Sequence, residues 1–258
     1  MSSGFRLHPS LRCFAETSPI PAATRLWRGK SARQVGAENH PHLPRTQPAF
    51  TLIELLVVIA IIGVLAALTL GALDSMKVKQ QISVTQAELA QLQMATERFK
   101  STTGVYPPDN PGNPVINQLY YELTGTIYDP VNKVFKTLDG SASISAADVS
   151  AAFGVTGFMN CAMKDGDPPA RSYLSDLRPG QIGTCTVNGV TVKLLVGSVG
   201  WPANVSSPPV PAQPNLNPWR YVSSKPTNNI GSYDFWMDLA IHGKTYRISN
   251  WSRNVQIF

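Results

Sequence analysis

The chain has 258 residues, 43% of them apolar, which suits one folded domain with additional segments. Its net charge of +6 is uneven, because residues 1–49 hold seven basic and two acidic residues and the remainder is close to neutral. This distribution argues against a basic stripe for nucleic-acid phosphates, so no nucleic-acid partner is expected. A basic segment before an apolar run is instead typical of the cytoplasmic flank of a membrane helix.

Residues 1–49 show no sustained periodicity and are rich in Pro, Ser and Arg. We interpret them as a leader that is either disordered or removed, and that lies on the cytoplasmic side. The segment is long for a leader, and no Met occurs between Met1 and Met76. The position of the translation start within 1–49 therefore stays open.

The apolar run from Leu55 to Leu73 has 19 residues without a charge. At about 1.5 Å per residue, a helix of this length nearly matches the ~30 Å hydrocarbon core of a bilayer. A buried core helix is the alternative, but it would show polar residues along one side, whereas this run is apolar around its circumference. The sequence predicts a single transmembrane half-helix over 50–73.

The following segment, 74–104, is polar with an apolar face spaced at three and four residues. That face consists of Ile82, Leu89, Leu92 and Phe99, with Thr85 and Thr96 between them. No Pro interrupts residues 50–106, so one continuous helix of about 50 residues is expected. Gly104 suits the left-handed turn that ends it.

The region 105–258 is predicted to be a globular part outside the cytoplasm, with a long irregular middle. Short helices are expected at 116–124 and 145–153, the second capped by Ser145, and a hairpin at 184–196 around Asn188-Gly189. Three alternating segments indicate strands, at 219–223, 233–241 and 245–251. The expected fold class is therefore α+β, with the long helix packed on a small C-terminal antiparallel sheet.

The motif before the apolar run reads Ala49-Phe50-Thr51-Leu52-Ile53-Glu54 and is followed by LLVVIAIIGVLAAL. It resembles the N-terminal signature of type IV pilins and of type II secretion pseudopilins. A Glu at the head of such a run is uncommon because an ionised carboxylate in lipid is costly. A weaker resemblance to major pseudopilins follows in Gly104-Val105-Tyr106-Pro107, Asn217-Pro218-Trp219, Tyr233-Asp234 and Asn250-Trp251.

The resemblance implies a pilin-like fold and processing by prepilin peptidase between Ala49 and Phe50, followed by N-methylation of Phe50. It also implies that Glu54 pairs with the N-terminal amine of a neighbouring subunit during assembly. The implied partners are other copies of the chain, minor pseudopilins, an inner-membrane assembly platform and the lipid bilayer. The implied location is the bacterial inner membrane, with a single pass, and the filament once assembled.

Two functions of one class follow from the resemblance, and a third of another class stays open. The first is a pseudopilin of a type II secretion system, and the alternative is a type IV pilin for adhesion, motility or DNA uptake. A membrane-anchored binding module for a secreted substrate is the third. Its contact patch would come from the aromatic residues Trp219, Tyr221, Tyr233, Trp236 and Trp251.

Catalytic residues, a metal and a cofactor are not expected, so the chain is predicted not to be an enzyme. The part after residue 49 holds one His, His242, and no phosphate-binding Gly loop. Major pseudopilins bind calcium in their final loop, but here 239–247 has no carboxylate, so that site is not expected. Cys161 and Cys185 would lie outside the cytoplasm, where they form either a disulfide or two buried thiols.

Overall fold

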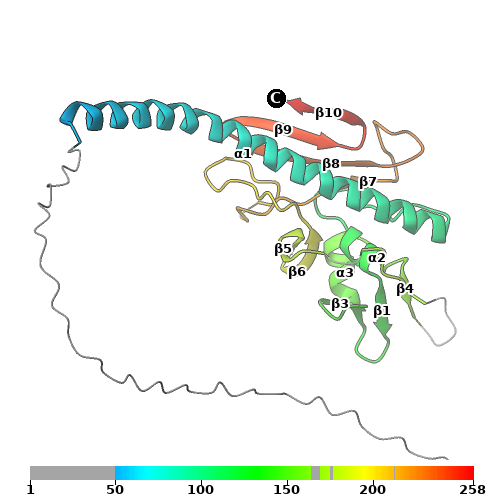
Figure 1. Cartoon of the computed structure of the whole chain (residues 1–258). Coiled ribbons are helices and arrows are strands. Elements are labelled where there is room, and N and C mark those ends of the chain that lie inside the picture. Colours follow the sequence, from blue (N-terminus) through cyan, green and yellow to red (C-terminus); the bar gives the residue numbers. More distant parts are fainter. Residues whose placement is uncertain (1–49, 164–168, 175–176, 212) are drawn as a thin grey trace, which may run out of the picture. The chain divides into compact units, whose positions relative to one another are not determined.

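The computed structural model describes residues 50–163, 169–174, 177–211 and 213–258, apart from the side chains of 69–73 (Figure 1). The chain divides into two units, Met1–Thr51 and Leu52–Phe258. Nearly all of the first unit lies outside the described residues, including the predicted leader and Ala49. The fold below is that of the second unit.

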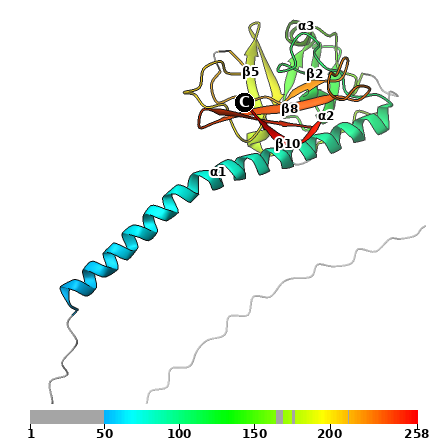
Figure 2. The ribbon, with the colours of Figure 1, turned by 90° about the horizontal axis from the view of Figure 1, so that it is seen from above.

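Helix α1 spans Leu52–Thr103 without interruption, which confirms the prediction of one continuous helix (Figures 1 and 2). The helix ends where Gly104 adopts a left-handed φ of 83° and its amide donates to the Lys100 carbonyl at 2.8 Å. Glycine adopts this conformation at little cost, which explains why the helix stops there.

The C-terminal sheet packs beside α1 and contains four antiparallel strands in the order β10-β9-β8-β7. The strands are β7 (Arg220–Val222), β8 (Asp234–Ile241), β9 (Lys244–Ser249) and β10 (Ser252–Ile257). Three of them match the predicted strands, and β10 was not predicted. His242 and Gly243 form the tight turn between β8 and β9, both with positive φ.

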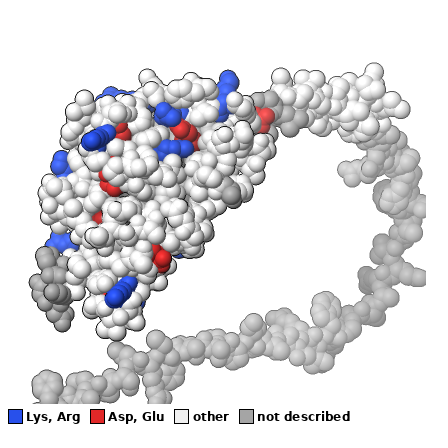
Figure 3. All heavy atoms as spheres, turned by 180° about the vertical axis from the view of Figure 1, so that it is seen from behind, with Lys and Arg blue, Asp and Glu red and all other residues white. Residues whose placement is uncertain are grey.

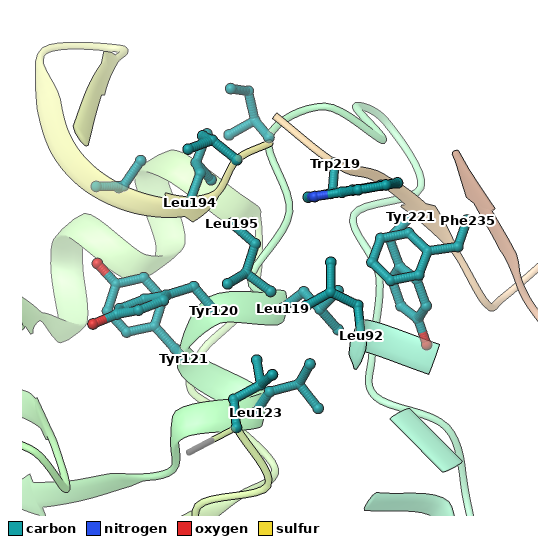
Figure 4. Close-up of a cluster of buried hydrophobic side chains, with 14 of the residues drawn as sticks. Leu92, Leu119, Tyr120, Tyr121, Leu123, Leu194, Leu195, Trp219, Tyr221 and Phe235 are labelled. Carbon is teal, nitrogen blue, oxygen red and sulfur yellow. The ribbon is translucent and has the colours of Figure 1, made fainter. Parts of the chain in front are cut away.

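The core lies where α1 meets the inner face of this sheet and the short helix α2 (Leu119–Thr124). Alternate residues of the strands point inward, among them Tyr221 and Phe235, both of which are fully buried. Figure 4 shows Leu92 of α1 between these rings and Leu119 of α2. Aromatic rings therefore provide much of the buried surface, with Trp219 and Phe235 packed edge to face at 5.3 Å.

The middle region is more regular than the sequence predicted. A second sheet has the order β3-β2-β1-β4, and a separate hairpin pairs β5 with β6. The elements are β1 (Thr126–Asp129), β2 (Val134–Thr137), β3 (Ser143–Ser145), α3 (Ala146–Phe153), β4 (Cys161–Ala162), η1 (Pro179–Gln181), β5 (Ile182–Val187) and β6 (Val190–Leu195). The expectation of a long irregular middle was therefore wrong for this second sheet. Its strands have two to four residues each, too few to show an alternating pattern.

Local signals in the middle region were more reliable than long-range ones. Ser145 caps α3, as predicted, by accepting a hydrogen bond from the Asp148 amide at 3.1 Å. Asn188 and Gly189 form the predicted two-residue turn, with φ of 50° and 79°. Positive φ at both positions is the requirement of the type I′ turn, which explains the Asn-Gly pair.

Candidate functional site

The described chain begins at Phe50, whose side chain is exposed, and α1 begins two residues later. Glu54 lies in the first turn of α1 and is also exposed. A carboxylate is favourable in a first turn because the helix N-terminus carries partial positive charge. Glu54 therefore fits its place in an isolated helix, before any partner subunit is considered.

Residues 52–68 of α1, called here the apolar arm, are exposed without exception. Among its large apolar residues, Val58 has the lowest exposed fraction, and that fraction is 47%. In the view of Figure 3, charged side chains gather on the globular body, and the arm is white. Monomeric soluble proteins seldom expose so large a continuous apolar surface, so the arm requires an apolar environment from outside its own subunit.

To span a membrane, a helix must be long and apolar over its whole length, which is more than the exposure of apolar side chains requires. Across the residues that the structure describes, no helix is both long enough and apolar enough to pass through a bilayer.

Residues 82–103 of α1, called here the packing half, behave differently from the arm. Leu89, Leu92 and Phe99 are buried, as are Thr85 and Thr96 between them, and Ile82 packs at the edge. The predicted face is thus confirmed. The two threonine hydroxyls donate to carbonyls one turn earlier, each at 2.9 Å, which satisfies these polar groups inside the core.

Glu88 is a buried acid on the same half of α1 and fastens the helix to the loop after β6. Its carboxylate accepts hydrogen bonds from the amide and hydroxyl of Ser198. At Gly197, an added Cβ would lie 2.5 Å from the sulfur of Met237, so any larger residue there would require the Met237 side chain to shift. The packing half is therefore held by a specific polar contact as well as by apolar burial.

Two carboxylates of β8, Asp234 and Asp238, have hydrogen-bonding partners within the chain. Asp234 accepts amides of Thr227, Asn228 and Asn229 at 2.8–2.9 Å. Burial acts to raise the pKa of Asp234, but these hydrogen bonds outweigh it, and the pKa is lowered. The Arg247 guanidinium donates two hydrogen bonds to the Asp238 carboxylate, from Nε to Oδ1 at 2.7 Å and from Nη2 to Oδ2 at 3.0 Å. Within the described ranges, no group of three or more His, Cys, Asp or Glu side chains could hold a metal ion.

The aromatic residues of the tail divide into two sets. Trp219, Tyr221 and Tyr233 are buried in the core. Trp236 and Trp251 lie on the outer face of the sheet with ring centroids 5.6 Å apart, and both line a cavity of about 420 Å³. Arg247 and Lys225 also line this cavity. Only the second set can act as a contact patch.

The two cysteines of the body are not joined in the structure. Cys161 lies on β4 beside β1, whereas Cys185 lies on β5 in the separate hairpin with β6. Cys185 is a buried thiol, and burial raises its pKa to about 11. The structure therefore does not contain the predicted disulfide. Cys185 instead fits the alternative, a thiol enclosed by apolar side chains.

A second buried acid lies on α2. Glu122 of α2 is fully buried, and its two carboxylate oxygens accept the amides of Met159 and Asn160 at 2.9 Å each. Burial raises the pKa of Glu122 to about 7, although these hydrogen bonds oppose the shift. A single Glu in a six-residue helix gives no sequence signal of such a role.

The long helix, with an apolar arm headed by an acid and a body built on its other half, defines a pilin-like protein. The comparisons with known proteins agree with this class. The prokaryotic N-terminal methylation motif matches residues 44–70. Fimbrial protein EcpC of Eikenella corrodens is 41% identical over 68 residues, which is 26% of this chain and 44% of that protein. Fimbrial protein EcpB of the same organism is 36% identical over 110 residues, 42% of this chain and 69% of that protein.

The chain therefore belongs to the type IV pilin-like family. It spans less than half the length of the first of these relatives and about two thirds of the second. No solved structure matches it significantly.

Proposed function

We propose that this chain is a structural filament subunit, a pseudopilin of a type II protein secretion system, with no catalytic role and no cofactor. Prepilin peptidase removes residues 1–49, and Phe50 becomes the N-methylated first residue. The observation that carries the proposal is the apolar arm, whose 17 exposed residues lie within the stretch 44–70 that matches the methylation motif.

The apolar arm suits two successive environments, first a bilayer and then the interior of a filament. In the sequence, uncharged residues run from Leu55 to Leu73, which is close to the length that a bilayer core requires. Before assembly, the subunit is anchored in the inner membrane with its body outside the cytoplasm. When copies assemble on the inner-membrane platform with minor pseudopilins, neighbouring arms replace lipid as the apolar surroundings.

In this proposal, Glu54 fixes the axial offset between neighbouring subunits. Strongly polar residues cost about 2.5–3.5 kcal/mol at the centre of a membrane helix, and less near the interface. Packing of arms would surround the Glu54 carboxylate with apolar side chains. The ammonium group at Phe50 of a neighbour offsets that cost at one relative position of the two helices, because an ion pair depends steeply on distance.

The choice of a secretion pseudopilin rests on the C-terminal residues that resemble major pseudopilins, from Asn217 to Trp251. The alternative is a type IV pilin for adhesion, motility or DNA uptake, in accord with the names of the fimbrial relatives. Neighbouring genes separate the two. A secretion ATPase and a secretin would favour the pseudopilin, and motility genes would favour the pilin.

Mass spectrometry of the N-terminus from cell membranes tests the precursor. We expect a chain that starts at N-methylated Phe50. A mature chain that keeps residues near Met1, or that starts elsewhere without a methyl group, would refute the processing step.

Glu54→Ala tests the assembly step, with Glu97→Ala as the matched control. Glu97 is an exposed acid on the packing half of the same helix. We expect Glu54→Ala to insert in the membrane normally but to form few filaments, and Glu97→Ala to assemble like the parent. Normal filaments from Glu54→Ala would refute the role given to Glu54.

A second function, a membrane-anchored module that binds a secreted substrate, is favoured by one observation. Trp236 and Trp251 line the outer cavity rather than the core, and paired aromatic rings are common at binding surfaces. The double variant Trp236→Ala/Trp251→Ala tests it. Loss of secretion with intact filaments would support the module, and normal secretion would dismiss it.

A further inference from the structure

The cavity on the outer face of the C-terminal sheet combines two indole rings with polar side chains. Trp236 of β8 and Trp251, just before β10, both line it, with their ring planes at 62° to each other. Thr227, Asn228 and Gln256 are among the polar residues that line it. Its volume of about 420 Å³ lies within the usual range for small-ligand sites. The cavity therefore offers flat apolar surfaces beside hydrogen-bonding groups.

The segments that form this cavity are fixed by contacts elsewhere in the body. Asp234 accepts the backbone amides of residues 227–229 at 2.8–2.9 Å, which shapes the loop before β8. The Asn250 side-chain oxygen accepts the Phe235 amide at 2.9 Å and so holds the turn that carries Trp251. Because both segments are held before any ligand arrives, binding requires little ordering of the protein.

Several donors at the cavity have no acceptor in the part of the chain that the structure describes. They are the indole N–H groups of Trp236 and Trp251, the ammonium group of Lys225 and the side-chain amide of Gln256. The one carboxylate among the lining residues, that of Asp234, is already occupied by the backbone amides. A ligand that carries several acceptors would satisfy these donors.

The side-chain charges around the cavity favour an anion. Arg247 pairs with Asp238, and Arg220 approaches the same carboxylate at 3.9 Å, so one acid serves two guanidinium groups. Lys225 has no ion-pair partner among the described residues. Three cations therefore stand against two carboxylates, Asp234 and Asp238, and both carboxylates already accept hydrogen bonds. The excess positive charge attracts a carboxylate on an incoming ligand.

An acidic sugar matches all of these features at once. The C–H face of a sugar ring packs on an indole as an apolar surface, and its hydroxyls bond to amide and hydroxyl groups at the edge. Its carboxylate pairs with a cation. An aromatic acid would use the indoles and the cation but would leave the polar groups of Thr227 and Gln256 unmatched.

We propose that this cavity binds a uronic acid unit of an acidic glycan, with the sugar ring packed on Trp236 and Trp251 and the carboxylate paired with Lys225. The inference rests on the second function proposed above, the substrate-binding module, and names the chemical group that the module recognises. It is independent of the choice between a pseudopilin and a pilin.

Calorimetric titration of the full-length chain in detergent tests the ligand class. The probes are trimers of galacturonate and of mannuronate, each compared with its own methyl ester, and a glutamate trimer. We expect at least one acidic sugar trimer to bind. Its methyl ester should bind about fivefold more weakly, because a partly exposed ion pair is lost while the sugar rings stay the same. The glutamate trimer should not bind.

Variants of the cavity assign the binding to these residues. Trp236→Ala and Trp251→Ala should each weaken binding of acid and ester alike by more than about tenfold, and Trp236→Phe should recover part of the loss. Lys225→Gln should weaken binding of the acid alone, to the level of the ester. Lys244→Gln is the matched control, because Lys244 is equally exposed but does not line the cavity. Circular dichroism checks that each variant folds.

Several results would overturn the inference: no acidic sugar bound, equal affinity for acid and ester, a glutamate trimer bound as tightly as the sugar, or unchanged affinity in both tryptophan variants. If the tryptophan variants do not fold, Lys225→Gln decides the matter, because Lys225 is exposed.

The secretion assay of Trp236→Ala/Trp251→Ala separates failure of this inference from failure of the module. Lost secretion without any sugar binding would keep the module and discard its acidic-sugar ligand. Normal secretion would dismiss the module, and the titration would then decide the ligand of the cavity by itself.

Discussion

The two halves of α1 are built from the same uninterrupted helix but serve different surroundings. The apolar arm exposes all of its 17 residues, whereas the packing half buries one face against the C-terminal sheet and α2. After Glu54 the arm is apolar around its circumference, and the packing half is apolar along one stripe. The width of the apolar surface, rather than helix propensity, therefore decides which half folds onto its own subunit and which half stays exposed.

The sharpest way to test this contrast is to place a charge in the arm. In Ile61→Asp we expect loss of filaments, because a carboxylate would be buried among neighbouring arms without a designed partner. The thermal unfolding of the globular body should not change, since Ile61 is 54% exposed in the subunit. Electron microscopy and calorimetry measure the two effects.

Met94→Asp is the matched control for Ile61→Asp, because Met94 is equally exposed but lies on the packing half. It should assemble normally. A destabilised body in Ile61→Asp would show that the arm contributes to folding of its own subunit, contrary to the comparison.

In the packing half, truncation of a buried side chain should lower the stability of the body rather than prevent filament assembly. Phe99 is fully buried and packs near Tyr173, with ring centroids 5.3 Å apart. Phe99→Ala is expected to lower the free energy of unfolding by about 3–5 kcal/mol through lost burial and a residual cavity. Leu65→Ala in the arm is the control and should cost nothing measurable in the same denaturant titration. Equal losses would erase the distinction between the halves.

Glu122 gives the body a dependence on pH that the arm lacks. Its pKa is raised from 4.5 to about 7 by burial, so the folded state holds this proton more tightly than the unfolded state. The resulting stability is fully present below pH 4.5 and is lost as pH rises through about 7. The loss is about 3 kcal/mol at 1.36 kcal/mol for each unit of pKa. Unfolding in denaturant at several pH values between 4.5 and 8 measures it.

Glu122→Gln cannot ionise and should flatten this profile, although one of the amides of Met159 and Asn160 then loses its acceptor. Asp129→Asn is a suitable control, because its carboxylate lies at the end of β1 and its hydrogen bonds with Asn132 and Lys136 lower its pKa. A profile that keeps its slope between pH 4.5 and 7 in Glu122→Gln would assign the dependence to another group.

The smallest expected effect concerns a local signal in the middle region. Ser145→Ala removes the hydroxyl that caps α3 and should cost about 1 kcal/mol. Ser145→Asp, which restores an acceptor at the same position, should recover most of it. A denaturant titration of both variants checks this, and equal stability of all three chains would mean that the cap is dispensable.

The sequence predicted well those features that rest on contiguous residues. The length of α1, its buried face from Leu89 to Phe99, the Asn188-Gly189 turn and the Ser145 cap all depend on neighbours within a few positions. The methylation motif at 44–70 was likewise visible, because a motif is local by definition. Cleavage between Ala49 and Phe50 and the role of Glu54 stay predictions.

Features that depend on distant pairing were missed. β4 has two residues and pairs with β1 from 35 positions earlier, and no local pattern predicts such a contact. Glu122 reaches 37 residues along the chain to its amide partner at Met159.

The continuity of helix α1 over 52 residues has a consequence for display on a filament surface. A stiff rod of about 78 Å transmits the orientation of its inner end to its outer end. Whatever angular repeat the arms adopt in the shaft, the bodies must repeat it too. The cavity of Trp236 and Trp251 would then recur along the outside as a regularly spaced row.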